Sequence, residues 1–216
     1  MRRGIPAATL VLLLASCGGE RAEPVQAAEP PPAATPAAAT AAAAPAPASA
    51  SSLGSISEEN GAVTISYMEN GEVRELYGDP RTTGKRKYTI GDGPVLYEVK
   101  PGDDGGFKLR NPDGSLRWKV KISDDKIKIS DNEENRNPYE LKVKDLNRVK
   151  VLGPGERELG NVRYAANRVE VENAGGSVVF TAEAKKATGA YGVLLCDAIP
   201  ERERYILAAE ILSRGR

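Results

Sequence analysis

Apolar and polar side chains alternate along short segments throughout residues 63–181 of this 216-residue chain. A period of two is that of strands with one buried face. In the clearest segment, residues 116–122, the apolar positions are Leu116, Trp118, Val120 and Ile122, and the polar positions are Arg117, Lys119 and Lys121. Turn sequences such as Asn70-Gly71 and Gly153-Pro154-Gly155 separate the segments. The pattern predicts an all-β fold of about twelve short antiparallel strands.

The last segment, residues 199–213, changes to a helical pattern. Its start has a proline suited to the first turn, a candidate cap and two acids suited to the helix dipole: Pro200, Asp197, Glu201 and Glu203. From Tyr205 to Leu212, only Glu210 is polar. A helix that is apolar nearly all round is buried on all sides. We therefore expect this helix inside a closed sheet, with Leu207 and Ile211 in the core.

This combination resembles the tubby-like roll of tubby C-terminal domains, phospholipid scramblases and LURP-one-related proteins. The LURP-one type repeats alternating residues, a D-x-x-G-like turn and further alternation, and Phe107 to Ile122 is similar to that unit, with Asn111-Pro112-Asp113-Gly114 as its turn. Further units resemble residues 126–131 and 159–173. The resemblance implies antiparallel strands in a closed roll around a central apolar helix. A lipocalin-like barrel, which usually packs its helix outside, and a β-sandwich are the alternatives.

The N-terminus predicts export with lipid attachment. Two arginines and the apolar run Ile5–Leu14 lead into Leu14-Ala15-Ser16-Cys17, as in a secretory signal. A cysteine directly after Leu-Ala-Ser resembles a bacterial lipobox. In that family the signal, here residues 1–16, is cleaved off, and the new N-terminal cysteine, here Cys17, carries diacylglycerol on its thiol.

Lipidation of Cys17 would hold the protein on a bilayer, because two or more acyl chains give stable anchoring. The apolar run is ten residues long, whereas a spanning helix needs about 20; an ordinary cleaved signal is the alternative. We expect a location in the bacterial cell envelope, and the absence of aspartate after Cys17 favours the outer membrane. Residues 17–55, rich in alanine and proline, are expected to be a disordered linker. Residues 56–216 are expected to form a single β domain.

The residue types available restrict the chemistry. The chain has no histidine, which is the commonest general base and a common zinc ligand. The acidic clusters at 103–104, 124–125 and 131–134 fit solvated turns better than a calcium loop, because a predicted strand separates the last two. No carboxylate pair is marked for hydrolysis. We therefore expect no catalytic residue, no metal and no cofactor. The apolar surroundings of Cys196 predict a buried structural thiol.

One basic cluster is a candidate binding site. Arg81, Lys85, Arg86 and Lys87 gather in a predicted loop. The tubby branch of the resembled family binds phosphoinositide headgroups through basic residues, so the resemblance makes these four residues candidate headgroup ligands; a solvated turn is the alternative. Basic and acidic residues number 30 each, and this balance does not indicate a nucleic-acid partner.

The sequence therefore predicts a membrane-anchored envelope lipoprotein with a noncatalytic interaction or structural β domain. Its expected partners are the membrane, through acylated Cys17, and an envelope protein or lipid. One alternative is a protein that binds a lipid or small apolar ligand, although a roll plugged by its own helix leaves little interior. The other alternative is a carboxylate-dependent hydrolase.

Overall fold

The computed structural model describes residues 54–215 apart from 103 and 186. The predicted signal peptide, Cys17 and most of the predicted linker lie outside these residues. Strand β1 already contains Gly54 and Ser55, the last two residues of the predicted linker.

Within the described residues, thirteen antiparallel strands form one sheet in sequence order, each paired with its neighbours along the chain. The strands are β1 (Gly54–Glu59), β2 (Ala62–Glu69), β3 (Glu72–Pro80), β4 (Arg86–Thr89), β5 (Tyr97–Pro101), β6 (Phe107–Arg110), β7 (Leu116–Ile122), β8 (Lys126–Ser130), β9 (Tyr139–Asp145), β10 (Arg148–Leu152), β11 (Glu158–Ala165), β12 (Arg168–Asn173) and β13 (Val178–Glu183). The helices are the α-helix α1 (Glu201–Ser213) and three short 3₁₀ helices, η1 (Thr82–Gly84), η2 (Pro154–Glu156) and η3 (Ala190–Leu195).

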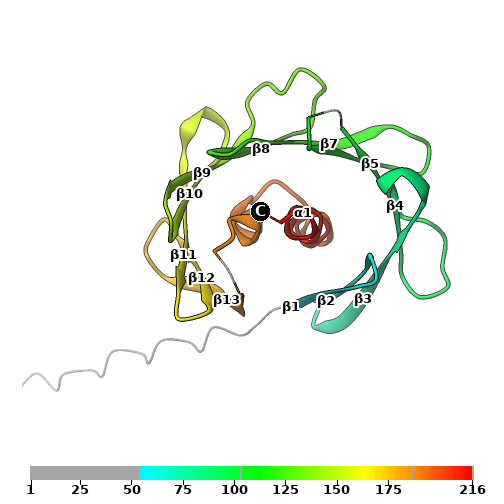
Figure 1. Cartoon of the computed structure of the whole chain (residues 1–216), viewed down its shortest axis with the longest axis horizontal. Coiled ribbons are helices and arrows are strands. Elements are labelled where there is room, and N and C mark those ends of the chain that lie inside the picture. The colour runs from blue at the N-terminus through cyan, green and yellow to red at the C-terminus, as the bar shows by residue number, and fades with distance from the viewer. Residues whose placement is uncertain (1–53, 103, 186, 216) are drawn as a thin grey trace, which may run out of the picture. The chain divides into compact units, whose positions relative to one another are not determined.

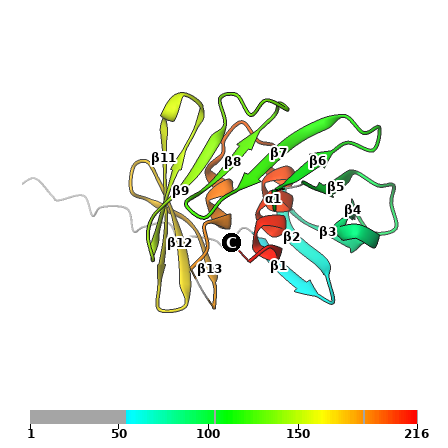
Figure 2. The same cartoon turned by 45° about the horizontal axis from the view of Figure 1, so that its top comes forward.

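The sheet curls into a nearly closed barrel around α1 and η3 (Figure 1). The predicted all-β fold with one C-terminal helix is confirmed. A single curled sheet replaces the two sheets of the sandwich alternative, and α1 lies inside the sheet, unlike the outer helix of a lipocalin. Figure 2 shows the same arrangement from an oblique direction, with α1 and η3 side by side within the strands.

The barrel has a seam between its first and last strands. All neighbouring strands are antiparallel, so β1 and β13 run in the same direction and would need a parallel pair to close the sheet directly. In the described part of the chain the two edges are not paired with each other. A cleft of about 1150 Å³ lies along the seam, lined by residues that include Ile56, Phe180 and Tyr191.

Alternation places the apolar residues on the inner face of the barrel. In β2, Val63, Ile65 and Tyr67 are buried, and in β7 Trp118 and Val120 are buried. The hairpin between β2 and β3 turns at Asn70-Gly71, both with positive φ (54° and 81°), as a type I′ turn requires.

Helix α1 begins at Glu201, two residues later than predicted, and Pro200 precedes it without a side-chain cap. Asp197 is therefore not the N-cap; its carboxylate accepts hydrogen bonds from Arg157 and Tyr139. Leu207 and Ile211 are fully buried, as predicted. No helix among the described residues is both long and apolar enough to cross a bilayer.

The 3₁₀ helix η3 was not predicted. It packs against β10, β11 and β12, and Gly192 makes the close approach possible. A Cβ atom at Gly192 would lie 2.8 Å from Cγ2 of Val151, so a larger residue does not fit without movement. Cys196 follows η3 and is buried, as predicted, and burial raises the pKa of its thiol.

Candidate functional site

Helix α1 carries two glutamates, Glu203 and Glu210, that are each only 1% exposed. No other charged side chain in the described ranges is buried as deeply. Seven residues are about two helical turns, so both carboxylates project from the same side of the helix. Burying an ionised carboxylate is costly unless cations and hydrogen-bond donors surround it. Each glutamate is surrounded in this way.

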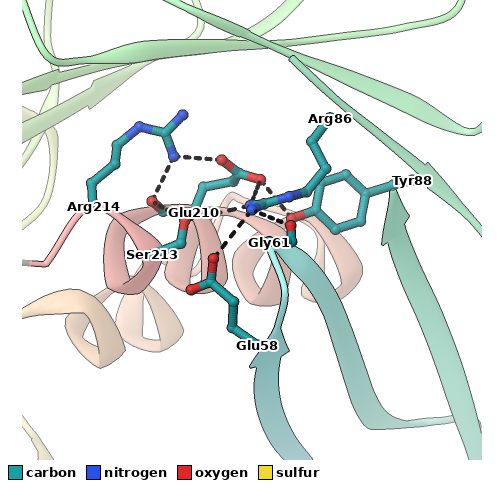
Figure 3. Close-up of polar contacts among 7 residues, drawn as sticks. All are labelled: Glu58, Gly61, Arg86, Tyr88, Glu210, Ser213 and Arg214. Atoms are coloured by element: carbon teal, nitrogen blue, oxygen red, sulfur yellow. Dashed lines mark hydrogen bonds and ion pairs between the residues drawn. The ribbon is translucent and has the colours of Figure 1, made fainter. Parts of the chain in front are cut away.

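The Glu210 cluster joins the C-terminal half of α1 to β4 (Figure 3). Arg86 Nη1 lies 2.5 Å from Glu210 Oε1, and the Tyr88 hydroxyl donates to the same oxygen at 2.7 Å. Arg214 donates to the other oxygen, Oε2. Arg86 also donates to the carbonyl oxygen of Gly61 at 2.9 Å. Burial and the neighbouring Glu210 charge raise the pKa of Tyr88 well above its usual value, so Tyr88 stays a hydrogen-bond donor.

The Glu203 cluster joins the first turns of α1 to β5 and β7. Arg117 Nη2 lies 2.6 Å from Glu203 Oε1, and the Tyr97 hydroxyl donates to that oxygen at 3.1 Å. The indole Nε1 of Trp118 donates to Oε2. Burial, and after it the Glu203 charge, raise the pKa of Tyr97 to about 12. Alternation along β7 places Arg117 on the face opposite Trp118 and Val120, yet its guanidinium reaches the buried Glu203 on the helix.

Two further arginines attach α1 to its surroundings. Arg202 makes two hydrogen bonds to the carboxylate of Glu69, at 2.8 and 2.9 Å, and one to the Tyr67 hydroxyl at 2.8 Å. Arg204 donates to the carbonyl oxygen of Leu194 in η3 at 2.7 Å. Strands β2, β4, β5 and β7 therefore all hold the helix through polar groups.

The two glutamate clusters are built to hold the helix in position. Each carboxylate accepts hydrogen bonds from an arginine and from at least one aromatic side chain. Their Cα atoms are separated by about 10 Å of helical rise, and they are fixed by different strands: Glu210 by β4, and Glu203 by β5 and β7. A hydrolytic pair would need two carboxyl groups facing one bond, so the clusters do not form one. Among the described residues, no three potential metal ligands of the carboxylate or thiol type gather.

The basic cluster predicted from the sequence is divided between two environments. Arg81 and Lys85 are exposed at either end of η1. Lys87 lies in β4, with its Nζ 3.2 Å from Glu98. Arg86 is directed inward to Glu210, so its guanidinium is part of the helix-holding cluster. Headgroup binding by the other three residues stays a prediction. Cys17, the predicted lipidation site, lies outside the described residues.

An apolar cavity of about 580 Å³ opens at one end of the barrel. Inward-facing residues of four consecutive strands, β8 to β11, form its wall: Ile127, Leu141, Val143, Val149, Val162 and Tyr164. The interior is therefore filled by helix, as predicted, in only part of the barrel. This cavity and the seam cleft are two hollowed regions to which a binding function can be assigned.

The buried glutamates were not recognised in the sequence. The sequence pattern assigns Glu203 only the role of an acid near the positive end of the helix. A signal was present, since two acids seven residues apart on an otherwise apolar helix share one face and need partners there.

Comparison of the chain with protein-family models, with curated proteins and with solved structures finds no match.

Proposed function

We propose that this protein is a lipid-anchored lipoprotein of the bacterial cell envelope whose β domain acts by binding rather than by catalysis. The observation that carries the proposal is Leu14-Ala15-Ser16-Cys17 after a short apolar run, because residue types, spacing and position all agree with a lipobox. Acyl chains on Cys17 would keep the domain beside a membrane.

The interior of the barrel supports a noncatalytic role. Glu203 and Glu210, the most deeply buried carboxylates of the residues that the structure describes, are paired with arginine and aromatic partners. A general acid or base has to exchange a proton with a substrate that reaches it, and these groups are committed to holding α1. Surfaces and cavities remain for a binding partner.

Mass spectrometry of the N-terminal peptide of the mature protein tests the anchor. We expect a peptide that begins at Cys17 and carries diacylglycerol on the thiol. A Cys17→Ser variant should lose labelling by radioactive fatty acid. A Cys196→Ala variant is the matched control and should keep it, because Cys196 is buried. An unmodified Cys17, or cleavage at another bond, would show that the lipobox interpretation is wrong.

A further inference from the structure

The apolar inner wall of the barrel extends beyond the part that α1 and η3 cover. Ile127, Leu141 and Val162 are buried at the base of the cavity. Val143 lies on the same face as Leu141, two residues further along β9, yet its side chain is 49% exposed. Inward-facing positions of a strand are normally covered by the core. Here the wall stays apolar up to the open end of the barrel, where side chains such as Val143 are exposed to solvent instead of packing against the core.

We propose that this cavity binds one hydrocarbon chain of an anionic amphiphile, with the charged head at the rim. The volume of about 580 Å³ falls within the range of small-molecule sites, roughly 300–1,000 Å³. The wall is aliphatic apart from Tyr164. Leu146, at the tip of the β9–β10 hairpin, lines the mouth and is 89% exposed, so a bound chain would bury it. The inference deepens the proposed binding function by naming the ligand class.

The rim favours a negatively charged head. Its charged residues are three bases and two acids: Lys126, Arg148, Arg163, Asp124 and Asp145. Arg148 on β10 lies directly opposite Arg163 on β11 and, on its other side, opposite Asp145 on β9. The like-charged pair of arginines is unfavourable, whereas the pair with Asp145 is favourable. Arg163 is paired with Glu172 at 3.0 Å, whereas Arg148 donates to the neutral amide oxygen of Asn161 at 3.2 Å. An anionic head beside Arg148 would relieve the repulsion.

Calorimetric titration tests the proposal on the mature chain from residue 17 with Cys17→Ser, which lacks only the lipid. Laurate should bind with one-to-one stoichiometry. In a series of shorter carboxylates, each added methylene should tighten binding about fourfold until the cavity is full. Dodecanol, which has the same chain and no charge, should bind about tenfold more weakly than laurate.

Two variants with matched controls locate the site. Val143→Trp should fill the mouth and abolish laurate binding, whereas Val73→Trp, at a strand valine that is 67% exposed and does not line the cavity, should not. Arg148→Gln should weaken laurate binding about tenfold and leave dodecanol binding unchanged. Lys150→Gln, two residues along the same strand and outside the rim, should affect neither ligand.

A lysophospholipid with one twelve-carbon chain distinguishes the source of the chain. Tighter binding of this probe than of laurate would identify membrane lipid as the ligand, and tighter binding of laurate would identify free fatty acid. Absence of saturable binding by both probes, or binding that Val143→Trp leaves intact, would overturn the proposal. Equal binding of laurate and dodecanol would overturn the anionic head. These outcomes are independent of the anchor, because an unlipidated Cys17 would remove the proposed anchoring and leave cavity binding in place.

Discussion

The two halves of the barrel hold their contents by different means. Strands β4, β5 and β7 hold α1 through buried ion pairs and hydrogen bonds to Glu203 and Glu210, and β2 holds it through hydrogen bonds to Arg202. Strands β10, β11 and β12 contact η3, where Gly192 lies against the apolar side chain of Val151. The ring of Tyr191 packs at a tilt against Phe180 of β13, with the ring centroids 5.2 Å apart.

This difference indicates which half of the barrel is able to accept a ligand. Directional bonds allow one helix position, because a shift would leave buried charges without partners. Apolar contacts are not directional, and the half that uses them is the one that contains the cavity of about 580 Å³. We infer that the ionic half fixes the fold and that the apolar half is available to a ligand.

Removing the carboxylate of Glu210 should have the largest effect on the ionic half. Glu210→Ala leaves the guanidinium of Arg86, whose side chain is 11% exposed, without its buried partner, and should lower the free energy of unfolding by about 3–5 kcal/mol. Urea denaturation measures the loss. Glu72→Ala is the control, because Glu72 pairs with Arg74 on the surface and should cost less than about 1 kcal/mol. Equal losses would mean that the Glu210 cluster does not hold the helix.

Apolar burial of α1 is the next largest contribution. Leu207 is fully buried, so Leu207→Ala should cost about 2–5 kcal/mol in thermal or urea unfolding. Leu146→Ala, at an exposed hairpin tip, should stay within about 0.5 kcal/mol. A loss of that small size at Leu207 would place α1 outside the core.

Enlarging Gly192 tests the apolar half. The Cβ of alanine would lie 2.8 Å from Val151 Cγ2 and 3.1 Å from Leu141 Cδ2, and this overpacking should destabilise the protein by about 1–3 kcal/mol in urea unfolding. Gly175→Ala, in an exposed turn, is the control and should change stability by less than about 0.5 kcal/mol. An unchanged Gly192→Ala protein would show that η3 moves freely against the wall.

High pH should weaken the ionic half by a smaller amount. The pKa of Tyr97 is raised to about 12 in the folded protein, against about 10 when unfolded. The folded state therefore retains a proton that the unfolded state loses. The contribution of Tyr97 to the free energy of unfolding is fully present below pH 10 and is lost as the pH rises from 10 to about 12. The melting temperature should decline across this window, with a shallower slope in Tyr97→Phe. An identical slope of melting temperature against pH in the variant would show that Tyr97 does not cause the loss of stability.

Local patterns were sufficient to predict most of the strands and the central helix. The alternation of Val63, Ile65 and Tyr67 predicts a strand with one buried face. The nearly all-apolar segment after Tyr205 predicts a buried helix. Strand β1 was missed because its sequence, Gly54–Glu59, has a single apolar residue. Its turn, Asn60-Gly61, has positive φ angles of 52° and 80° and is the same dipeptide as the recognised Asn70-Gly71. That signal was available in the sequence.

The polar clusters were beyond a local prediction. Arg86 and Glu210 are separated by 124 residues, and Arg117 and Glu203 by 86. Their pairing depends on which strands curl around the helix, and alternation within a strand carries no such information. The six-residue η3 is likewise too short to show a helical period. The cavity lies beside Ala187–Gly189, just before η3 begins, and its position depends on how the whole fold places η3 against the sheet.

Hydrogen–deuterium exchange of the mature Cys17→Ser chain, with and without laurate, compares the two halves in one measurement. We expect amides 205–211 of α1 to exchange only through global unfolding and to be unchanged by laurate. We expect slower exchange with laurate at residues 143–149 and 187–189, which line the cavity. Faster local opening of α1 than of η3, or protection by laurate at α1 and not at residues 143–149, would contradict the division into a fixed half and a binding half.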